Sequence, residues 1–572
     1  MVQYLIFSRK PYAGRPAGVA ARYAACAVLA MLPISVAGHT PATRPLIFAA
    51  ASAFIYQLAC PLLTRAGGRR DSEVLLAGAD AAVGMLAFGM LSALLLIGGP
   101  CCWLVGPLEL AMLATVIVQS TYFIMYGSAM DAYGFRLMTQ TNTNEVIEFI
   151  RYYPVWVSGL LVCAIAGVLT ACEWVNLPAA PLLPLPDAAM VGAAGLACVI
   201  AACAGGRNSL AAHSGFVSFW LDKRDAMRRL RDYPQFRGER EKGISLQHLG
   251  RPYDGPSTIV LVIGESANRD YMSAFADTGD RETTPWMSAC SRDDSRHWTL
   301  FPNAYSCGMH TFKALEHGLT EKNQFRDVDF ATAASIVDMA RAAGRRVHWY
   351  SNQGHLGASL SQVSVIAEQA DEAMWTNQQP GLPPYDRELL AFLDRVDPSR
   401  DNLVVLHLKG NHFSFENRYP AEAETWRPDS EADTRTTYMN SIRYVDTLLR
   451  DVWREGTERL NMKAMVYCSD HAIIPDRHRA PTFTGFGDVR IPLAVWTSED
   501  FIASHAERYT ALRANAQCCW TNDFLYDLMC GLMDVQSPRF DPSGSLAHSA
   551  YSYRREQLTV LDGTVRLAGD TE

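Results

Sequence analysis

The first 205 residues contain apolar runs that are long enough to cross a lipid bilayer. A helix needs about 20 apolar residues to span the hydrocarbon core, and this part of the chain holds such runs at 17–37, 45–64, 74–98, 104–127, 154–173 and 187–204. Gly98, Gly99 and Pro100 mark either a short loop between two spans or a break in a re-entrant arrangement. The pattern predicts an N-terminal α-helical transmembrane domain of five or six spans, over residues 1–205.

Basic residues near the first two runs indicate how the predicted spans are oriented across the membrane. They are Arg9, Lys10, Arg15 and Arg22 before the first run, and Arg65, Arg69 and Arg70 after the second. The positive-inside rule places both flanks in the cytoplasm. Six complete spans then return the C-terminal part to the cytoplasm, whereas five export it, and the sequence leaves both counts open.

Composition changes after the last apolar run. Residues 206–255 form a basic amphipathic linker, which we expect to lie along the membrane surface, and residues 256–572 have the mixture of charge, aromatics, Pro and Gly that is typical of a soluble domain. The whole chain has 51 Lys and Arg against 59 Asp and Glu, a net charge of -8. This balance argues against a nucleic-acid partner, because binding to phosphate backbones needs clustered positive charge.

The soluble part alternates short apolar runs with stretches of helical periodicity. We expect strands at 258–263, 346–350, 403–408, 463–467 and 491–496, and helices at 333–343 and 438–455. Several of the strands are apolar throughout, as in a parallel sheet covered on both faces. The alternation predicts an α/β sandwich.

Side chains that can bind metal or move protons follow three of the expected strands. Glu265 follows the first, His412 follows the third, and Asp470 and His471 follow the fourth. Active sites of α/β folds lie at the carboxyl ends of strands, so we expect these side chains to meet. Thr311 precedes a stretch of helical spacing and is an N-cap or first-turn residue, where the helix N-terminus would stabilise anionic oxygens on a phosphorylated threonine.

Seven segments together resemble a known family. They are TNTNE at 141–145, VLVIGES at 260–266 with ETTP at 282–285, the segment around Thr311, NQ at 352–353, HLKGNHFSFENRYP at 407–420, SDH at 469–471 and RIPLAVWTS at 490–498. The chain resembles bacterial phosphoethanolamine transferases of the alkaline phosphatase/sulfatase superfamily, and it looks most similar to the branch that acts on the lipopolysaccharide core. The resemblance implies that the C-terminal α/β domain is sulfatase-like.

The resemblance also implies a metal site and a nucleophile. Glu265, Asp470 and His471 would bind Zn²⁺, and Thr311 would be both the nucleophile and a further ligand. Two carboxylates, an imidazole and an alkoxide satisfy the four-coordinate preference of zinc.

Four more residues receive roles from the resemblance. His412 and His478 would lie close to the transferred phosphate, as acid/base groups or as ligands of a second ion. Thr141 and Glu145 would help to hold the ethanolamine headgroup, since a carboxylate suits an ammonium group.

The implied reaction moves phosphoethanolamine from phosphatidylethanolamine to a cell-envelope glycolipid or glycan, either the lipopolysaccharide core or lipid A. It would pass through a phosphothreonine intermediate, in a monomeric multi-pass protein of the bacterial inner membrane whose catalytic domain lies in the periplasm. Alternatives on the same fold are a glycerol-phosphate transferase, a phosphatase or a sulfatase. A different class is a membrane scaffold without catalytic activity.

The sequence departs from the family pattern at two places near the expected site. Ala472, Ile473 and Ile474 follow the SDH motif, where the family usually has glycine and then an acidic residue. Glu316 and His317 occupy the region where a disulfide partner for Cys307 would fall. The first difference affects the shape of the loop after His471, and the second leaves Cys307 without an evident partner.

Overall fold

The structure is a computed structural model. It describes residues 230–242, 255–353, 361–376, 385–430, 433–476, 483–535 and 537–571, with single residues at 104, 184, 186, 187, 189, 193, 228, 244 and 253. The chain divides into two compact units, Met1–Thr141 with Glu145–Ala226, and Asn142–Asn144 with Met227–Glu572. The second unit holds nearly all the described residues.

The predicted membrane spans lie almost entirely outside the described residues. Within the described part of the chain, no helix combines the length and the apolar character that a membrane crossing requires. The number of spans and the boundaries of the transmembrane domain and linker therefore stay predictions.

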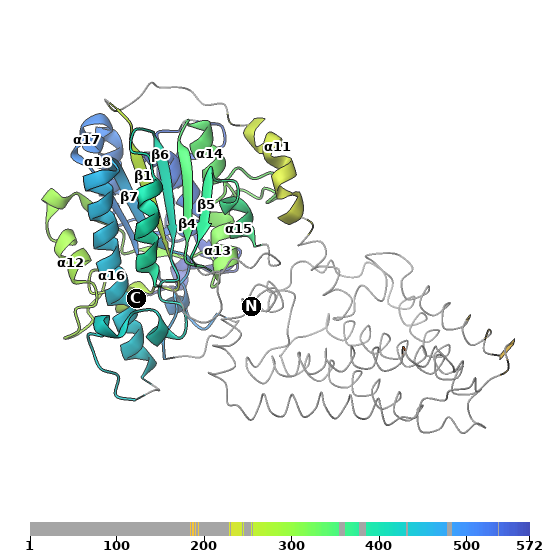
Figure 1. Cartoon of the computed structure of the whole chain (residues 1–572), viewed down its shortest axis with the longest axis horizontal. Coiled ribbons are helices and arrows are strands. Elements are labelled where there is room, and N and C mark those ends of the chain that lie inside the picture. The colour runs from red at the N-terminus through yellow and green to blue at the C-terminus, as the bar shows by residue number, and fades with distance from the viewer. Residues whose placement is uncertain are drawn as a thin grey trace. The chain divides into compact units, whose positions relative to one another are not determined.

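A seven-stranded sheet forms the centre of the second unit (Figure 1). Its strands, in spatial order, are β2 (Trp298–Leu300), β8 (Leu493–Thr497), β7 (Met462–Ser469), β1 (Thr258–Gly264), β6 (Asn402–His407), β4 (Arg346–Ser351) and β5 (Glu372–Trp375). Strand β1 is parallel to both neighbours, and its last residue, Gly264, lies opposite Ser469, the last residue of β7. Two small sheets pair β3 (Ala304–Tyr305) with β9 (Trp520–Thr521), and β10 (Thr559–Val560) with β11 (Val565–Arg566).

Helices cover both faces of the sheet (Figure 1). The described helices are α11 (Arg237–Lys242), α12 (Pro285–Ser291), α13 (Thr311–Gly318), α14 (Ile336–Ala342), α15 (Gln362–Ala367), α16 (Thr434–Arg459), α17 (Glu499–Ser504), α18 (Ala506–Ala514) and α19 (Leu525–Leu532). Helices α12 and α16 contribute to the core on one face, and α13, α14, α15 and α19 contribute to the core on the other.

The alternation of side chains along β1 explains the two cores. Ile259, Leu261 and Ile263 belong to one core, whereas Val260 and Val262 belong to the other. Successive side chains of a strand point to opposite faces, so a continuous apolar run is stable only if both faces are covered. The predicted α/β sandwich is confirmed for the C-terminal domain.

One expected strand has a different direction from the others. Strand β8 runs antiparallel to β7, and β2 runs antiparallel to β8, so this side of the sheet is mixed. The other four expected strands are present, and they are parallel wherever they pair with one another. The expected helices are also present, although α14 is shorter than predicted and α16 is longer.

Part of the predicted linker packs against the rest of the second unit. Arg240 on α11 is fully buried, and its guanidinium lies 3.0 Å from Oδ2 of Asp338. It also donates to the carbonyl oxygens of Tyr233 and Ala331, at 2.6 and 3.1 Å. Because a buried charge is tolerated when it is paired and hydrogen-bonded, this contact anchors residues 233–242 on the domain.

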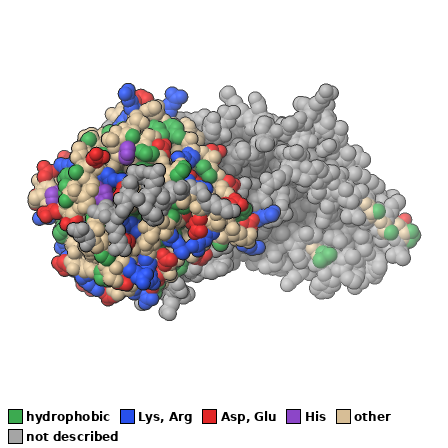
Figure 2. Space-filling view, turned by 90° about the horizontal axis from the view of Figure 1, so that it is seen from above, with side chains coloured by type: hydrophobic (Ala, Val, Ile, Leu, Met, Phe, Trp, Pro, Cys, Tyr) green, Lys and Arg blue, Asp and Glu red, His purple; other side chains and the backbone are tan. Residues whose placement is uncertain are grey.

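The surface of the domain mixes both signs of charge. Figure 2 shows acidic and basic side chains interspersed over the visible face, with single hydrophobic side chains between them. This distribution is typical of a solvated protein surface.

Candidate metal centre

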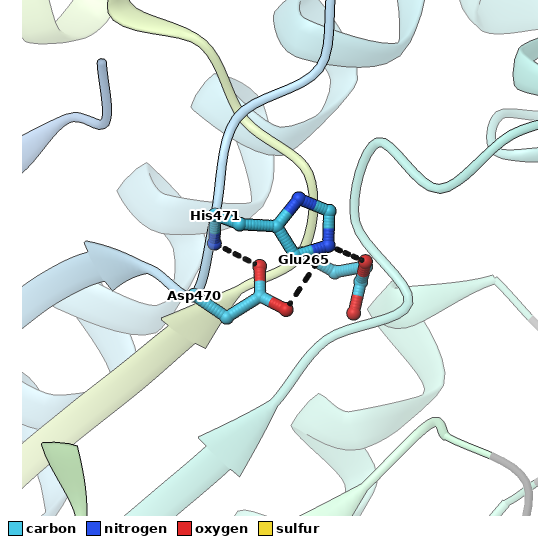
Figure 3. A group of neighbouring side chains, drawn as sticks. All are labelled: Glu265, Asp470 and His471. Atoms are coloured by element: carbon cyan, nitrogen blue, oxygen red, sulfur yellow. Dashed lines mark hydrogen bonds and ion pairs between the residues drawn. The ribbon is translucent and has the colours of Figure 1, made fainter. Parts of the chain in front are cut away.

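Two neighbouring strands bring the predicted metal ligands together. Glu265 comes directly after β1, and Asp470 and His471 come directly after β7. Because these strands pair with their last residues opposite each other, the side chains converge at one edge of the sheet (Figure 3). The amide of Asp470 also donates to the carbonyl of Gly264, at 3.0 Å.

The three side chains form a compact, buried group. One ligand atom from each lies within 4.8 Å of the other two. Nε2 of His471 is 3.1 Å from Oε1 of Glu265 and 3.5 Å from Oδ2 of Asp470. Two carboxylates buried together are unfavourable unless a cation balances them, and this donor set suits a divalent metal.

The orientation of His471 prepares it to bind a metal. Its Nδ1 lies 3.0 Å from the carbonyl oxygen of Ala472. A carbonyl oxygen can only accept, so Nδ1 carries a proton. Nε2 is then the ring nitrogen that faces the two carboxylates and can bind a metal between them. Such an outer hydrogen bond is the usual support of a metal-binding histidine.

Hydrogen bonds also hold the two carboxylates. Oδ1 of Asp470 accepts from the amides of Ser266 and His471, at 3.0 and 2.6 Å. The hydroxyl of Ser266 donates to Oε1 of Glu265, at 2.7 Å. Ser266 therefore contacts both acidic side chains and ties one to the other.

Thr311 lies against this group. Its hydroxyl donates to Oε2 of Glu265, at 2.9 Å. It is the first residue of α13, and His310 is the N-cap, so of the two predicted placements the first turn is correct. The hydroxyl thus sits at the N-terminus of a helix and next to the candidate metal ligands.

Two residues that the sequence patterns did not assign to the site support Glu265 and the loop after β6. Nε2 of Gln353 donates to Oε2 of Glu265, at 3.2 Å, and to the carbonyl of Leu408, at 2.6 Å. The buried carboxylate of Asp386 accepts from the amides of Lys409 and Gly410, at 2.7 and 2.8 Å. The NQ motif at 352–353 was a signal for the first, but nothing in the sequence marked Asp386.

Gly410 permits the loop after β6 to approach Glu265. Its φ is +51°, and a Cβ there would lie 2.9 Å from both the nitrogen and the oxygen of the Glu265 main chain. We expect Gly410→Ala to lower the free energy of unfolding by about 2 kcal/mol or more, through backbone strain plus overpacking. Thermal unfolding of the purified chain measures this.

Gly344 provides the matched control for that substitution. Its φ is +79°, but a Cβ there would meet no atom within 4 Å. Gly344→Ala should therefore cost only the backbone strain, about 1 kcal/mol. Equal losses for the two variants would contradict the close packing at Gly410.

Burial and the neighbouring charge of Glu265 raise the pKa of Asp470 to about 7. A metal binds the carboxylate and must displace the proton of the acid. Above pH 7 Asp470 is already ionised, so metal affinity should change little; below pH 7 it should fall about tenfold per pH unit. Competition with a chelator between pH 6 and 8.5 measures this, and an affinity that stays constant down to pH 6 would contradict it.

The remaining predicted residues have different outcomes. His412 lies in the loop after β6, whose Asn411 amide donates to the carbonyl of Glu265, at 2.9 Å, but the compact group of ligand atoms does not include it. His478, Thr141 and Glu145 lie outside the described residues. The roles assigned to all four stay predictions.

The structure also shows the two departures from the family pattern. Ala472 and Ile473 are both buried, one in each hydrophobic core, so the unusual loop is packed. Cys307 is buried, and neither it nor the other five cysteines of the described domain form a disulfide.

Comparisons with known proteins agree with the geometry. Residues 257–532 match the sulfatase family. Over 276 residues the chain is 28% identical to phosphoethanolamine transferase EptC of Escherichia coli, an alignment that covers 45% of this chain and 47% of that protein. It is 25% identical over 321 residues to the Kdo(2)-lipid A phosphoethanolamine 7''-transferase of Salmonella typhimurium, covering 50% and 53%. The chain thus spans about half the length of the curated relatives it matches.

A solved structure resembles a larger part of the chain. It is the integral membrane protein lipooligosaccharide phosphoethanolamine transferase A of Neisseria meningitidis, with a TM-score of 0.60 and 18% identity. The match covers 90% of this chain and 99% of that one, which shows a shared fold. The resemblance seen in the sequence is confirmed: residues 257–532 match the sulfatase family, and the chain is similar in sequence to phosphoethanolamine transferases.

Proposed function

We propose that this protein transfers phosphoethanolamine from phosphatidylethanolamine to the lipopolysaccharide core or lipid A. The observation that carries the proposal is the hydroxyl of Thr311, 2.9 Å from Glu265 and at the start of α13. This hydroxyl lies beside a buried group of candidate metal ligands, as a nucleophile would, in a domain similar in sequence to named phosphoethanolamine transferases.

We infer that the metal is zinc, held by Glu265, Asp470, His471 and Thr311. Four nitrogen and oxygen ligands suit its tetrahedral preference. When bound, zinc would lower the pKa of the threonine hydroxyl and offset negative charge on the phosphoryl oxygens. The buried carboxylates and the lone pair of His471 Nε2 fit this ion.

In the first half of the proposed reaction, Oγ1 of Thr311 attacks the phosphorus of phosphatidylethanolamine. The O–P bond to Thr311 forms and the O–P bond to diacylglycerol breaks. The hydroxyl proton leaves toward Oε2 of Glu265, which already accepts it as a hydrogen bond. His412 or His478 protonates the departing diacylglycerol oxygen.

In the second half, an acceptor oxygen attacks the phosphothreonine. The new O–P bond forms on the glycolipid and the bond to Thr311 breaks, and Oγ1 of Thr311 takes back its proton from Glu265. The histidine that gave up its proton now takes one from the acceptor hydroxyl. The positive end of the helix dipole at the start of α13 would stabilise the charged phosphoryl group.

The donor is a membrane lipid, and we infer that the N-terminal part holds the enzyme in the bacterial inner membrane with its catalytic domain in the periplasm. The likeness of the fold to an integral membrane protein over 90% of the chain supports this. Thr141 and Glu145 would bind the ethanolamine group of the donor, and the protein would act as a monomer.

The same site could serve other donors, as in a glycerol-phosphate transferase, or simple hydrolysis by a phosphatase or sulfatase. A scaffold without activity is less favoured, because it would have no need for two buried carboxylates, an oriented imidazole and a threonine in contact.

One experiment separates these functions. The purified full chain is loaded with zinc and incubated with detergent-dispersed phosphatidylethanolamine, in parallel with phosphatidylglycerol. We expect diacylglycerol release and a phosphoethanolamine adduct on the protein with the first lipid only. An adduct formed only with phosphatidylglycerol would show that this lipid is the donor. Release of free phosphoethanolamine, with no adduct and no transfer to added lipid A, would indicate a hydrolase.

A further inference from the structure

Asn522 lies at the junction between the metal-binding loop and the segment that leads to Thr311. It is the first residue of a short 3-10 helix, Asn522–Phe524, directly after β9, and it is fully buried. Strand β9 pairs in parallel with β3, so that Thr521 lies opposite Tyr305. The next residues, Asn522 and Ser306, are thereby brought side by side.

The side-chain amide of Asn522 bridges these two segments. Its Oδ1 accepts from the amide of Cys307, at 2.8 Å. Its Nδ2 donates to the carbonyl of Asp470, at 2.6 Å, and approaches the hydroxyl of Ser306, at 3.3 Å. Nδ2 therefore holds the main chain of the candidate metal ligand Asp470, and Oδ1 holds the segment that precedes Thr311.

The chemistry of the partners fixes which way the amide faces. The nitrogen of Cys307 can only donate and the carbonyl of Asp470 can only accept, so the oxygen and nitrogen of Asn522 cannot exchange places. All its polar atoms are used: one acceptor and two donors each have a partner. A shorter side chain cannot span both segments.

The main chain of Asn522 also contacts the end of α13. A Cβ on Gly318, the last residue of that helix, would lie 2.7 Å from the carbonyl oxygen of Asn522. Close packing at this point limits how far α13 can move along its axis. Asn522 thus touches the helix that begins with Thr311 at its far end, as well as the residues that precede it.

We propose that Asn522 is a positioning residue that sets the placement of Asp470 relative to Thr311. The observations do not place it in contact with substrate; it acts through the main chain of Asp470 and of Cys307, which precedes Thr311. Its effect on metal binding is independent of the proposed function, whereas its effect on the transfer rate rests on that function.

Loss of the amide should loosen both sides of the site. The buried amide of Cys307 would lose its described acceptor, and the carbonyl of Asp470 would keep only the hydroxyl of Ser306, at 2.6 Å. That hydroxyl has a single proton, and it also lies 2.6 Å from the carbonyl of Gly308. The serine therefore cannot replace the bridge.

The test compares Asn522→Ala and Asn522→Thr with Asn402→Ala in the full chain. Asn402 is equally buried, and its Nδ2 donates to two carbonyls, of Asp397 and Arg400, at 2.9 and 2.8 Å. It lies at the start of β6, at the opposite end of the sheet from the metal ligands. Threonine is nearly equal in volume to asparagine, so Asn522→Thr provides the test if the alanine variant does not fold.

Zinc affinity, measured by chelator competition, is the first readout. We expect both Asn522 variants to bind zinc roughly 10- to 100-fold more weakly, the range for residues that support a metal ligand, while Asn402→Ala changes affinity by less than about threefold despite a similar loss of thermal stability. If the Asn522 variants and Asn402→Ala lose stability alike and all bind zinc like the parent chain, the proposal is wrong.

The transfer reaction provides the second readout. Misplacement of the nucleophile should lower kcat roughly 10- to 100-fold with little change in KM for the lipid donor. A change confined to KM would overturn the positioning role. If the parent chain shows no transfer at all, the proposed function fails, and the zinc affinities still decide the role of Asn522.

Discussion

Replacing Thr311 with alanine should lower the rate of phosphoethanolamine transfer by about 10⁴-fold or more, the scale seen when a covalent nucleophile is removed. The alanine has no oxygen to form the bond to phosphorus, so no adduct should appear on the chain. Intact-mass measurement after incubation with phosphatidylethanolamine checks this directly. The substitution removes only a hydroxyl, which donates to Glu265, so the fold should be retained.

Thr311→Ser and Thr320→Ala are the matched variants. The serine keeps a hydroxyl at the start of α13 and should still form the adduct. Thr320 follows the same helix, and its hydroxyl donates to the carbonyl of Glu316, at 2.7 Å; its loss should cost about 1 kcal/mol of stability and leave transfer unchanged. An adduct that persists in Thr311→Ala would assign the nucleophile to another residue.

Asp470→Asn should weaken zinc binding by more than roughly 100-fold, since changes to residues that merely support a ligand already cost 10- to 100-fold. The amide keeps the shape and the oxygen that accepts from Ser266, at 3.0 Å, but it removes the negative charge from the ligand atom. Metal analysis after dialysis and chelator competition measure the loss. Transfer should fall with metal occupancy.

Asp446→Asn is the control for that substitution. Asp446 is also a buried aspartate that accepts from two main-chain amides, those of Trp286 and Met287, at 2.8 and 3.0 Å. Burial raises its pKa to about 6, so a neutral amide is a modest change there. Zinc affinity should stay at the parent value. Equal losses of zinc in the two variants would show that the effect comes from general destabilisation.

The parts of the fold that the sequence predicted are those with strong local patterns. The run TIVLVI at 258–263 is apolar at every position after Thr258, which a strand tolerates only at the centre of a covered sheet, and it became β1. Strand β8 is equally apolar, but its direction depends on the connection that precedes it and on pairing with β2. No local pattern encodes that choice.

The predicted site shows the same division. Glu265, Asp470 and His471 could be grouped because the ends of parallel strands meet at one edge of a sheet. Asn522 could not, because its role depends on strands of two residues, β3 and β9, whose partners lie more than 200 positions apart. Asp386 was hidden for a similar reason: its partners are main-chain amides, which carry no residue-specific signal.

The pairing of β1 with β7 has a consequence for how the metal can leave. Glu265 and Asp470 continue two central strands whose final residues, Gly264 and Ser469, are paired. These carboxylates can separate only if the middle of the sheet opens, which is among the most costly motions of a domain. Thr311 begins an eight-residue helix, which can shift without breaking that ladder. Loss of the ion should therefore leave the spacing of the two carboxylates unchanged, while the packing of Gly318 against Asn522 at the far end of α13 limits movement of the nucleophile.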